Sequence, residues 1–159
     1  MEAGTAPSSQ PPTATRTDSR TDTCTATRTD SRSAPWLLGD IEAAVRGSWD
    51  ASTTTPEHRP SWSADNPARD QCGVTALVIN DLLGGDLIRG EVHTDGEWTD
   101  YHWWNRLGAG VEIDLTREQF GPHERVSGGT VIARPDEIVR LREEYELLRD
   151  RVLERLRRE

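Results

Sequence analysis

Lysine is absent from this chain of 159 residues, so all 19 of its basic residues are arginine. Aspartate and glutamate together number 28, which gives a formal net charge of −9 at pH 7. An acidic balance of this size disfavours binding to the phosphates of nucleic acids. We therefore predict that the chain has no nucleic-acid partner.

Long apolar runs and cysteines are also scarce. No stretch is long and apolar enough to cross a bilayer, and the N-terminus lacks the apolar region of a signal peptide. We therefore expect no membrane partner. One of the two cysteines, Cys24, lies in the N-terminal tail, and the other, Cys72, lies at the start of a predicted helix. We therefore expect no disulfide between them. Free thiols of this kind predict a cytoplasmic protein.

Residues 1–34 contain almost no large apolar side chain. The sequence Thr-Ala-Thr-Arg-Thr-Asp-Ser-Arg occurs at 13–20 and again at 25–32, and neither copy has an apolar face to bury. We predict a disordered Thr/Ser/Arg-rich tail over 1–34 and a single domain over 35–159.

The domain shows helical and extended patterns in a readable order. Asp40 is expected to cap a helix that runs to Trp49, and the apolar run Cys72–Leu83 predicts a buried helix that ends at Gly84. Further on we predict strands at Asp86–Thr94, Glu97–Leu107, Val111–Leu115 and Thr130–Ala133, and a long helix from Pro135 to the C-terminus. The pattern predicts an α+β fold in which the central helix packs on a small antiparallel meander.

Cys72 stands in the first turn of the predicted central helix. Unpaired N–H groups and the helix dipole favour a thiolate at this position, and the same N–H groups can stabilise an oxyanion. We therefore predict that Cys72 is a nucleophile with a lowered pKa.

His102 and Asp114 follow Cys72 on two predicted strands that a short turn connects. On adjacent antiparallel strands their side chains can meet, so Asp114 would hold one ring nitrogen and leave the other facing the helix start. Thiol, imidazole and carboxylate together suit nucleophilic acyl chemistry. Each also has a structural interpretation, as a core thiol, a packed aromatic neighbour and a solvent-facing carboxylate.

Four further residues are candidates for binding substrate or an oxyanion. Gln71 precedes the thiol and Asn66 lies a few residues upstream, so either amide could donate to an oxyanion. Trp104 is expected on the same face as His102, because alternate residues of a strand share a face. Asn105 could orient substrate, although pairing within the hairpin would explain it equally well.

A metal site is the competing interpretation of the same side chains, since thiolate and imidazole suit zinc. The possible ligands are Cys72, His93, His102, Asp114 and His123. No two of them are closely spaced in the way that zinc motifs require. We therefore predict no metal and no cofactor.

The segment from Trp62 to Phe120 resembles the YunG-like family of small bacterial proteins. The matching motifs are Gln71-Cys72 with Thr75-Ala76, Asp81-Leu82-Leu83-Gly84-Gly85, His102 with Trp104-Asn105-Arg106-Leu107, and Asp114-Leu115-Thr116 with Gln119-Phe120. More broadly, the order Cys72, His102, Asp114 resembles the papain-like and transglutaminase-like superfamily. That resemblance implies a helix-borne thiol packed on a sheet.

These observations predict a cysteine-dependent amide hydrolase or acyltransferase that acts on a peptide or small-molecule amide. The alternative is a non-catalytic binding domain that uses its Trp-rich hairpin as a contact surface. The last helix carries an apolar stripe at spacings of 3 and 4 residues. We expect this stripe to pack on the sheet, and the alternative is a weak homodimer through the same helix.

Overall fold

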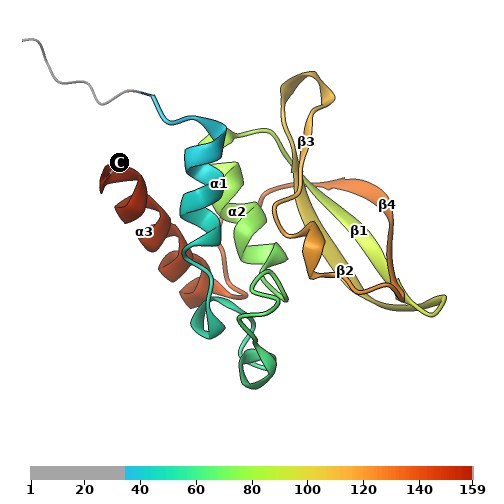
Figure 1. Cartoon of the computed structure of the whole chain (residues 1–159). Helices are drawn as coiled ribbons and strands as arrows, with labels where there is room; N and C mark the ends of the chain where they lie inside the picture. Colours follow the sequence, from blue (N-terminus) through green and yellow to red (C-terminus); the bar gives the residue numbers. More distant parts are fainter. Residues whose placement is uncertain (1–34, 159) are drawn as a thin grey trace, which may run out of the picture. The chain divides into compact units, whose positions relative to one another are not determined.

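The computed structural model describes residues 35–158, which form three α-helices beside a curled four-stranded antiparallel sheet (Figure 1). The fold is therefore α+β, in agreement with the sequence pattern. The predicted disordered tail over 1–34 lies outside the described residues. None of the helices in the described part has the length and apolar character needed to cross a membrane.

The first helix, α1, spans Leu38–Arg46 and buries Ile41, Ala44 and Val45. Its N-cap is Leu37, so the prediction of Asp40 as N-cap is wrong. Asp40 instead sits in the first turn, where its Oδ2 accepts a hydrogen bond from the Leu37 N–H at 2.7 Å. The carboxylate still satisfies a free donor at the helix start, but it does so from within the helix.

The central helix, α2, spans Cys72–Leu83, as the sequence predicted. It packs against β2 on one side and α3 on another, which explains why apolar residues occur around most of its circumference. Gly84 adopts a positive φ of 69° and ends the helix by donating its N–H to Asn80 O at 2.9 Å.

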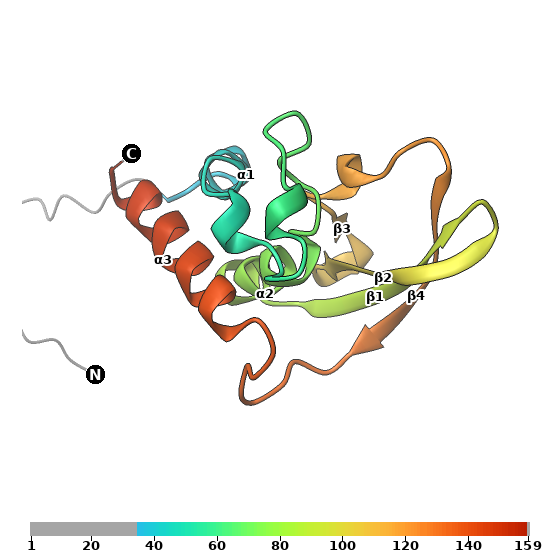
Figure 2. The ribbon, with the colours of Figure 1, turned by 90° about the horizontal axis from the view of Figure 1, so that it is seen from below.

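The sheet contains β1 (Asp86–Thr94), β2 (Glu97–Arg106), β3 (Glu112–Ile113) and β4 (Glu124–Ile132), in the order β3-β2-β1-β4. Only β1 to β3 form the predicted meander, because the chain then returns so that β4 pairs with β1. The curl of the sheet is visible from below in Figure 2.

Two of the predicted strands have the wrong boundaries. The third strand is shorter than Val111–Leu115, and β4 begins at Glu124 rather than Thr130. Gly128-Gly129 lies within β4, where the register with β1 shifts and the strand continues through the irregularity.

The two faces of the sheet have different partners. On one face Asn105 donates its Nδ2–H to Ala76 O at 2.9 Å and so fixes β2 to α2. On the other face the Trp104 ring lies over Gly90 of β1 and Gly129 of β4, where a Cβ atom would meet the ring at 2.9 Å and 3.3 Å. These two glycines therefore provide the room that Trp104 occupies.

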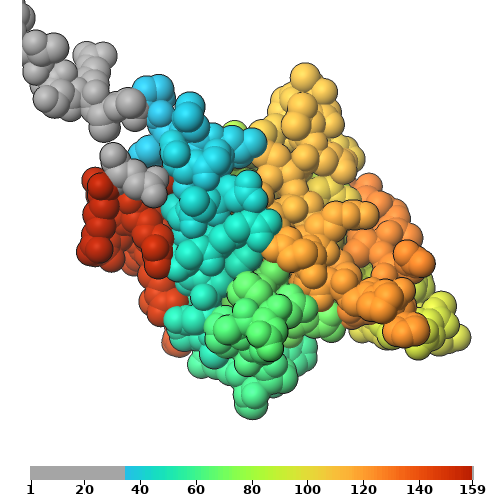
Figure 3. All heavy atoms as spheres, in the orientation of Figure 1, coloured from blue at the N-terminus to red at the C-terminus, as the bar shows by residue number. Residues whose placement is uncertain are grey.

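The last helix, α3, spans Arg142–Arg158, so the predicted start at Pro135 is wrong. Leu141, with a φ of 59°, turns the chain immediately before the helix. The predicted apolar stripe is buried against α1 and α2, so the prediction that it packs on the sheet is wrong. Figure 3 shows α3 lying along α1. The core residues that the three helices share are Ile41, Ala44, Val45, Val74, Val78, Ile79, Tyr145, Leu148, Val152 and Leu156.

Replacing Gly90 by alanine is expected to destabilise the fold by about 1–3 kcal/mol, because the added Cβ overpacks the sheet. It would lie 2.9 Å from both the Trp104 ring and the Ser127 carbonyl oxygen. The free energy of unfolding, measured with urea, checks this. Gly39→Ala is the control, since a Cβ there meets nothing within 4 Å and Gly39 lies within α1. Equal stabilities of the two variants would contradict the packing described for Trp104.

Candidate functional site

Cys72 is the first residue of α2 and the free cysteine within the described part of the chain. The residue is half-buried and lines two cavities, of about 510 Å³ and about 350 Å³. Both cavities are also lined by Asp70, Asp100 and Tyr101. The thiol therefore stands where a small molecule could reach it, beside two carboxylates.

Burial raises the pKa of the Cys72 thiol from 9.0 to about 11. The backbone N–H groups of Trp103 and Gly73 favour the thiolate, while the carboxylates of Asp100 and Asp70 oppose it. The prediction of a lowered pKa is therefore wrong. Removal of the sulfur from water outweighs the backbone donors that favour the thiolate.

His102 and Asp114 are brought together by the pairing of β2 with β3. The His102 Nε2 lies 2.8 Å from Asp114 Oδ2, and the His102 side chain is only 1% exposed. Asp114 follows β3 directly, and its Oδ1 accepts the N–H of Thr116 at 3.2 Å. The carboxylate is thus fixed by its own backbone and in turn fixes the imidazole.

The second ring nitrogen of His102 is occupied by Gln119. An ionised carboxylate only accepts hydrogen bonds, so Nε2 carries the ring proton and Nδ1 is an acceptor. The Gln119 Nε2 lies 3.3 Å from that Nδ1. The orientation of this amide is consistent with its other contact, since Gln119 Oε1 accepts the Asp70 N–H at 3.3 Å.

Cys72 is not hydrogen-bonded to His102 anywhere in residues 35–158, and the two residues line different cavities. His102, Trp104 and Asp114 line one of about 450 Å³. Gln119 and Phe120 lie between Cys72 and His102, because both line the larger Cys72 cavity and both contact His102. The Phe120 ring packs edge-on against the imidazole at 4.8 Å between centroids.

Three of the four auxiliary candidates donate to backbone carbonyl groups. Gln71 is fully buried and its Nε2 donates to Asp50 O at 3.0 Å, while Asn66 Nδ2 donates to Gln119 O at 3.0 Å. Asn105 binds Ala76 O, as described above. Trp104 stacks on His102 with 5.6 Å between ring centroids. Of the four, only Trp104 lies against a residue of the predicted triad.

The five possible metal ligands do not converge. Across residues 35–158 there is no group of three or more His, Cys, Asp or Glu side chains that could hold a metal ion. His93 and His123 face other carboxylates, at 3.7 Å from Glu91 and 3.2 Å from Asp95. The zinc interpretation therefore gains no support from the geometry.

Backbone strain is concentrated beside the thiol. Among the residues that the structure describes, four non-glycine residues have a positive φ, and two of them, Asp95 and Ala109, lie in turns between strands. The other two, Asp70 and Leu141, each have a φ of 59° and both line the smaller Cys72 cavity. For a residue as bulky as leucine this conformation is costly, and such strain is common at functional sites.

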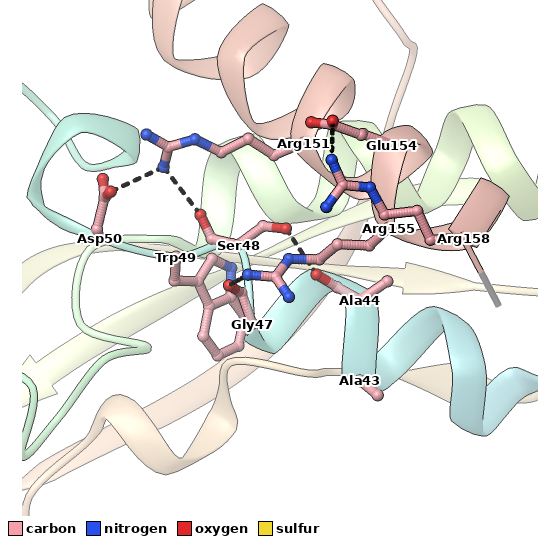
Figure 4. A pocket seen from close by; sticks show the side chains of 10 residues that line it. All are labelled: Ala43, Ala44, Gly47, Ser48, Trp49, Asp50, Arg151, Glu154, Arg155 and Arg158. Carbon is pink, nitrogen blue, oxygen red and sulfur yellow. Dashed lines mark hydrogen bonds and ion pairs between the residues drawn. The ribbon is translucent and has the colours of Figure 1, made fainter.

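A further cavity, of about 620 Å³, lies between the end of α1 and α3 and is lined by arginines (Figure 4). Arg151 donates to Ser48 O at 3.1 Å and to Asp50 Oδ2 at 2.9 Å, and Arg155 donates to Gly47 O. These guanidinium groups satisfy carbonyls at the C-terminal end of α1. We therefore interpret this cluster as structural.

Comparison with known proteins gives one family. The profile of the family described as "YunG protein" matches residues 37–157. Among curated proteins, the "Uncharacterized protein YunG" of Bacillus subtilis (strain 168) is 35% identical over 80 residues, which is 50% of this chain and 60% of that protein. The matched region thus covers less than two thirds of the relative. No solved structure matches.

Sequence reasoning missed Gln119 and Phe120 as neighbours of His102. Both belong to the motif that resembles the YunG-like family. The one available signal was that they follow Asp114 within six residues, because a turn after a short strand can return the chain over the same face.

Alkylation of Cys72 by iodoacetamide is expected to rise with pH until about 11, because the thiolate is the reacting species. Cys24→Ser leaves Cys72 as the single thiol. At pH 9 an ordinary thiol is half ionised, whereas Cys72 would be roughly 1% ionised. The same protein unfolded in urea serves as the control, and a midpoint below 9 in the folded protein would contradict the burial of the sulfur.

The same shift predicts a pH dependence of stability. The folded pKa lies above the unfolded one, so between pH 9.0 and about 11 the native state binds more protons than the unfolded state. Stability contributed by Cys72 is therefore complete below pH 9 and declines toward pH 11. Comparing urea unfolding of the Cys24→Ser protein with that of Cys24→Ser/Cys72→Ala over this window measures it, and parallel curves would contradict the shift.

Proposed function

We propose that this chain, which belongs to the YunG family, is a cysteine-dependent acyltransferase or amide hydrolase. Cys72 is the nucleophile, His102 the general base, and Asp114 the residue that positions His102, as in papain-like sites. The observation that carries the proposal is the buried His102–Asp114 pair at 2.8 Å, because it fixes the proton on Nε2 and leaves Nδ1 as the basic nitrogen.

In the first step the Cys72 sulfur attacks the carbonyl carbon of an amide or thioester. The C–S bond forms while the bond to the leaving group breaks, and the thiol proton passes through His102 to the departing nitrogen or sulfur. In the second step water or an acceptor amine attacks the acyl-enzyme and restores the thiol. The backbone N–H groups of Trp103 and Gly73, which favour the thiolate, would donate hydrogen bonds to the oxyanion that forms on the carbonyl oxygen.

The resting form is unreactive in this proposal. The thiol is neutral, and Nδ1 of His102 is occupied by Gln119, so the base has first to be released. Both the Gln119–His102 and the Gln119–Asp70 hydrogen bonds measure 3.3 Å, longer than the usual 2.9–3.0 Å. Such long bonds cost little to break, so binding of a substrate in the Cys72 cavity could displace the Gln119 amide.

A binding domain is the second candidate, and one observation favours it. Trp98 and Tyr101 on the β1–β2 hairpin are 53% and 40% exposed and pack edge-on at 5.5 Å. Arg89 lies 4.4 Å from the centre of the Tyr101 ring. An exposed aromatic pair beside a guanidinium group has the composition of a protein-contact surface.

Incubation with an activated acyl donor such as an acetyl thioester is expected to form an acyl adduct on Cys72. Intact mass and peptide mapping would detect the adduct, and Cys72→Ala would abolish it. His102→Ala is expected to slow acylation by about 10²–10⁴-fold. Asp114→Asn should slow it less and change its pH profile, because a neutral amide no longer holds the proton on Nε2.

His123→Ala is the matched control, since its side chain is 75% exposed and lines neither of the two Cys72 cavities. It should leave the acylation rate unchanged. If Cys72 remains unacylated between about pH 6 and pH 10, or if His102→Ala and His123→Ala behave alike, the binding domain replaces the enzyme as the proposal.

A further inference from the structure

We propose that the acyl group transferred to Cys72 is an apolar chain, and that it occupies an apolar cavity next to the thiol. The inference rests on the proposed function, because it assigns the substrate class of that site. The cavity measures about 310 Å³ and lies between α2, the sheet and the segment before α3. Leu77, Leu87, Ile132 and Pro135 supply most of its apolar wall.

The apolar cavity adjoins the smaller Cys72 cavity. Gly73, Trp103, Arg140 and Leu141 line both of them. Gly73 follows Cys72 in α2, and the Trp103 N–H favours the Cys72 thiolate. A carbonyl carbon bonded to the sulfur would thus stand at the junction, with the apolar cavity on one side.

The wall of the apolar cavity selects the kind of acyl group. Asp70 and Asp100 line the smaller Cys72 cavity, whereas Arg140 lines both cavities, so the charges beside the sulfur are mixed. Apart from Arg140 and Gly73, every residue that lines the apolar cavity is apolar, which favours methylene groups over polar ones. A cavity of this size lies at the lower end of the range for small-molecule sites, which suits a chain of medium length.

The space is open beside Gly73. A Cβ atom built on this helical glycine meets nothing within 4 Å, so the absent side chain leaves room at the junction of the two cavities. Valine at this position would project into that room, and alanine would do so to a smaller extent. Gly73 is therefore the position at which the capacity for an acyl chain can be changed with least disturbance of the packing.

The test compares N-acetylcysteamine thioesters of straight-chain acids from acetyl to decanoyl, with kcat/KM for acylation of Cys72 as the readout. In the wild-type chain kcat/KM is expected to rise by roughly fourfold per methylene until the cavity is full. Gly73→Val is expected to reduce the octanoyl-to-acetyl ratio at least tenfold, and Gly73→Ala by less. Gly39→Ala, on α1, is the control and should keep the wild-type ratio.

Thermal unfolding of each variant shows whether it is folded. If Gly73→Val is unfolded, the comparison rests on Gly73→Ala. Equal rates for acetyl and octanoyl thioesters, or a ratio unchanged by both Gly73 variants, would overturn the assignment of an apolar acyl chain. If acetyl adducts form on Cys72 in that case, only this inference fails. If no thioester acylates Cys72 at all, the proposed function fails with it.

Discussion

The side-chain amide of Gln119 forms hydrogen bonds to three segments that lie apart in the sequence, at His102, Thr116 and Asp70. It is buried, its Nε2 donates to His102 Nδ1 and to Thr116 O, and its Oε1 accepts the Asp70 N–H. One amide thus links strand β2, the turn after β3 and the residues that lead into α2. It also settles the state of the imidazole, since an amide donor at Nδ1 and a carboxylate at Nε2 admit only one neutral tautomer.

The raised pKa of the Cys72 thiol has a separate cause. Burial of the sulfur outweighs the backbone N–H groups of Trp103 and Gly73, which favour the thiolate, and the carboxylates of Asp100 and Asp70 raise the pKa further.

The central helix and the first hairpin could be predicted because their signals are local. An apolar run closed by Gly84 defines α2, and Asp95-Gly96 defines the turn between β1 and β2. The course of β4 could not be predicted in this way. It depends on the Trp104 ring, which needs glycine at Gly129 for its own packing, so a residue type that usually ends a strand is retained inside one. The start of α3 likewise depends on a strained turn at Leu141.

The same division applies to the site. The spacing of His102 and Asp114 across a short turn was enough to expect that they meet, because neighbouring strands pair. Whether His102 also meets Cys72 depends on the face of β2 from which the imidazole projects. Trp103 projects toward α2, so His102, its neighbour along the strand, projects to the other face, where Gln119 and Phe120 cover it. The order of residue types along the chain does not show from which face of β2 each side chain projects. In this fold the alternation of side chains along β2 places the imidazole on the face opposite the one that α2 covers, so His102 and Cys72 line different cavities.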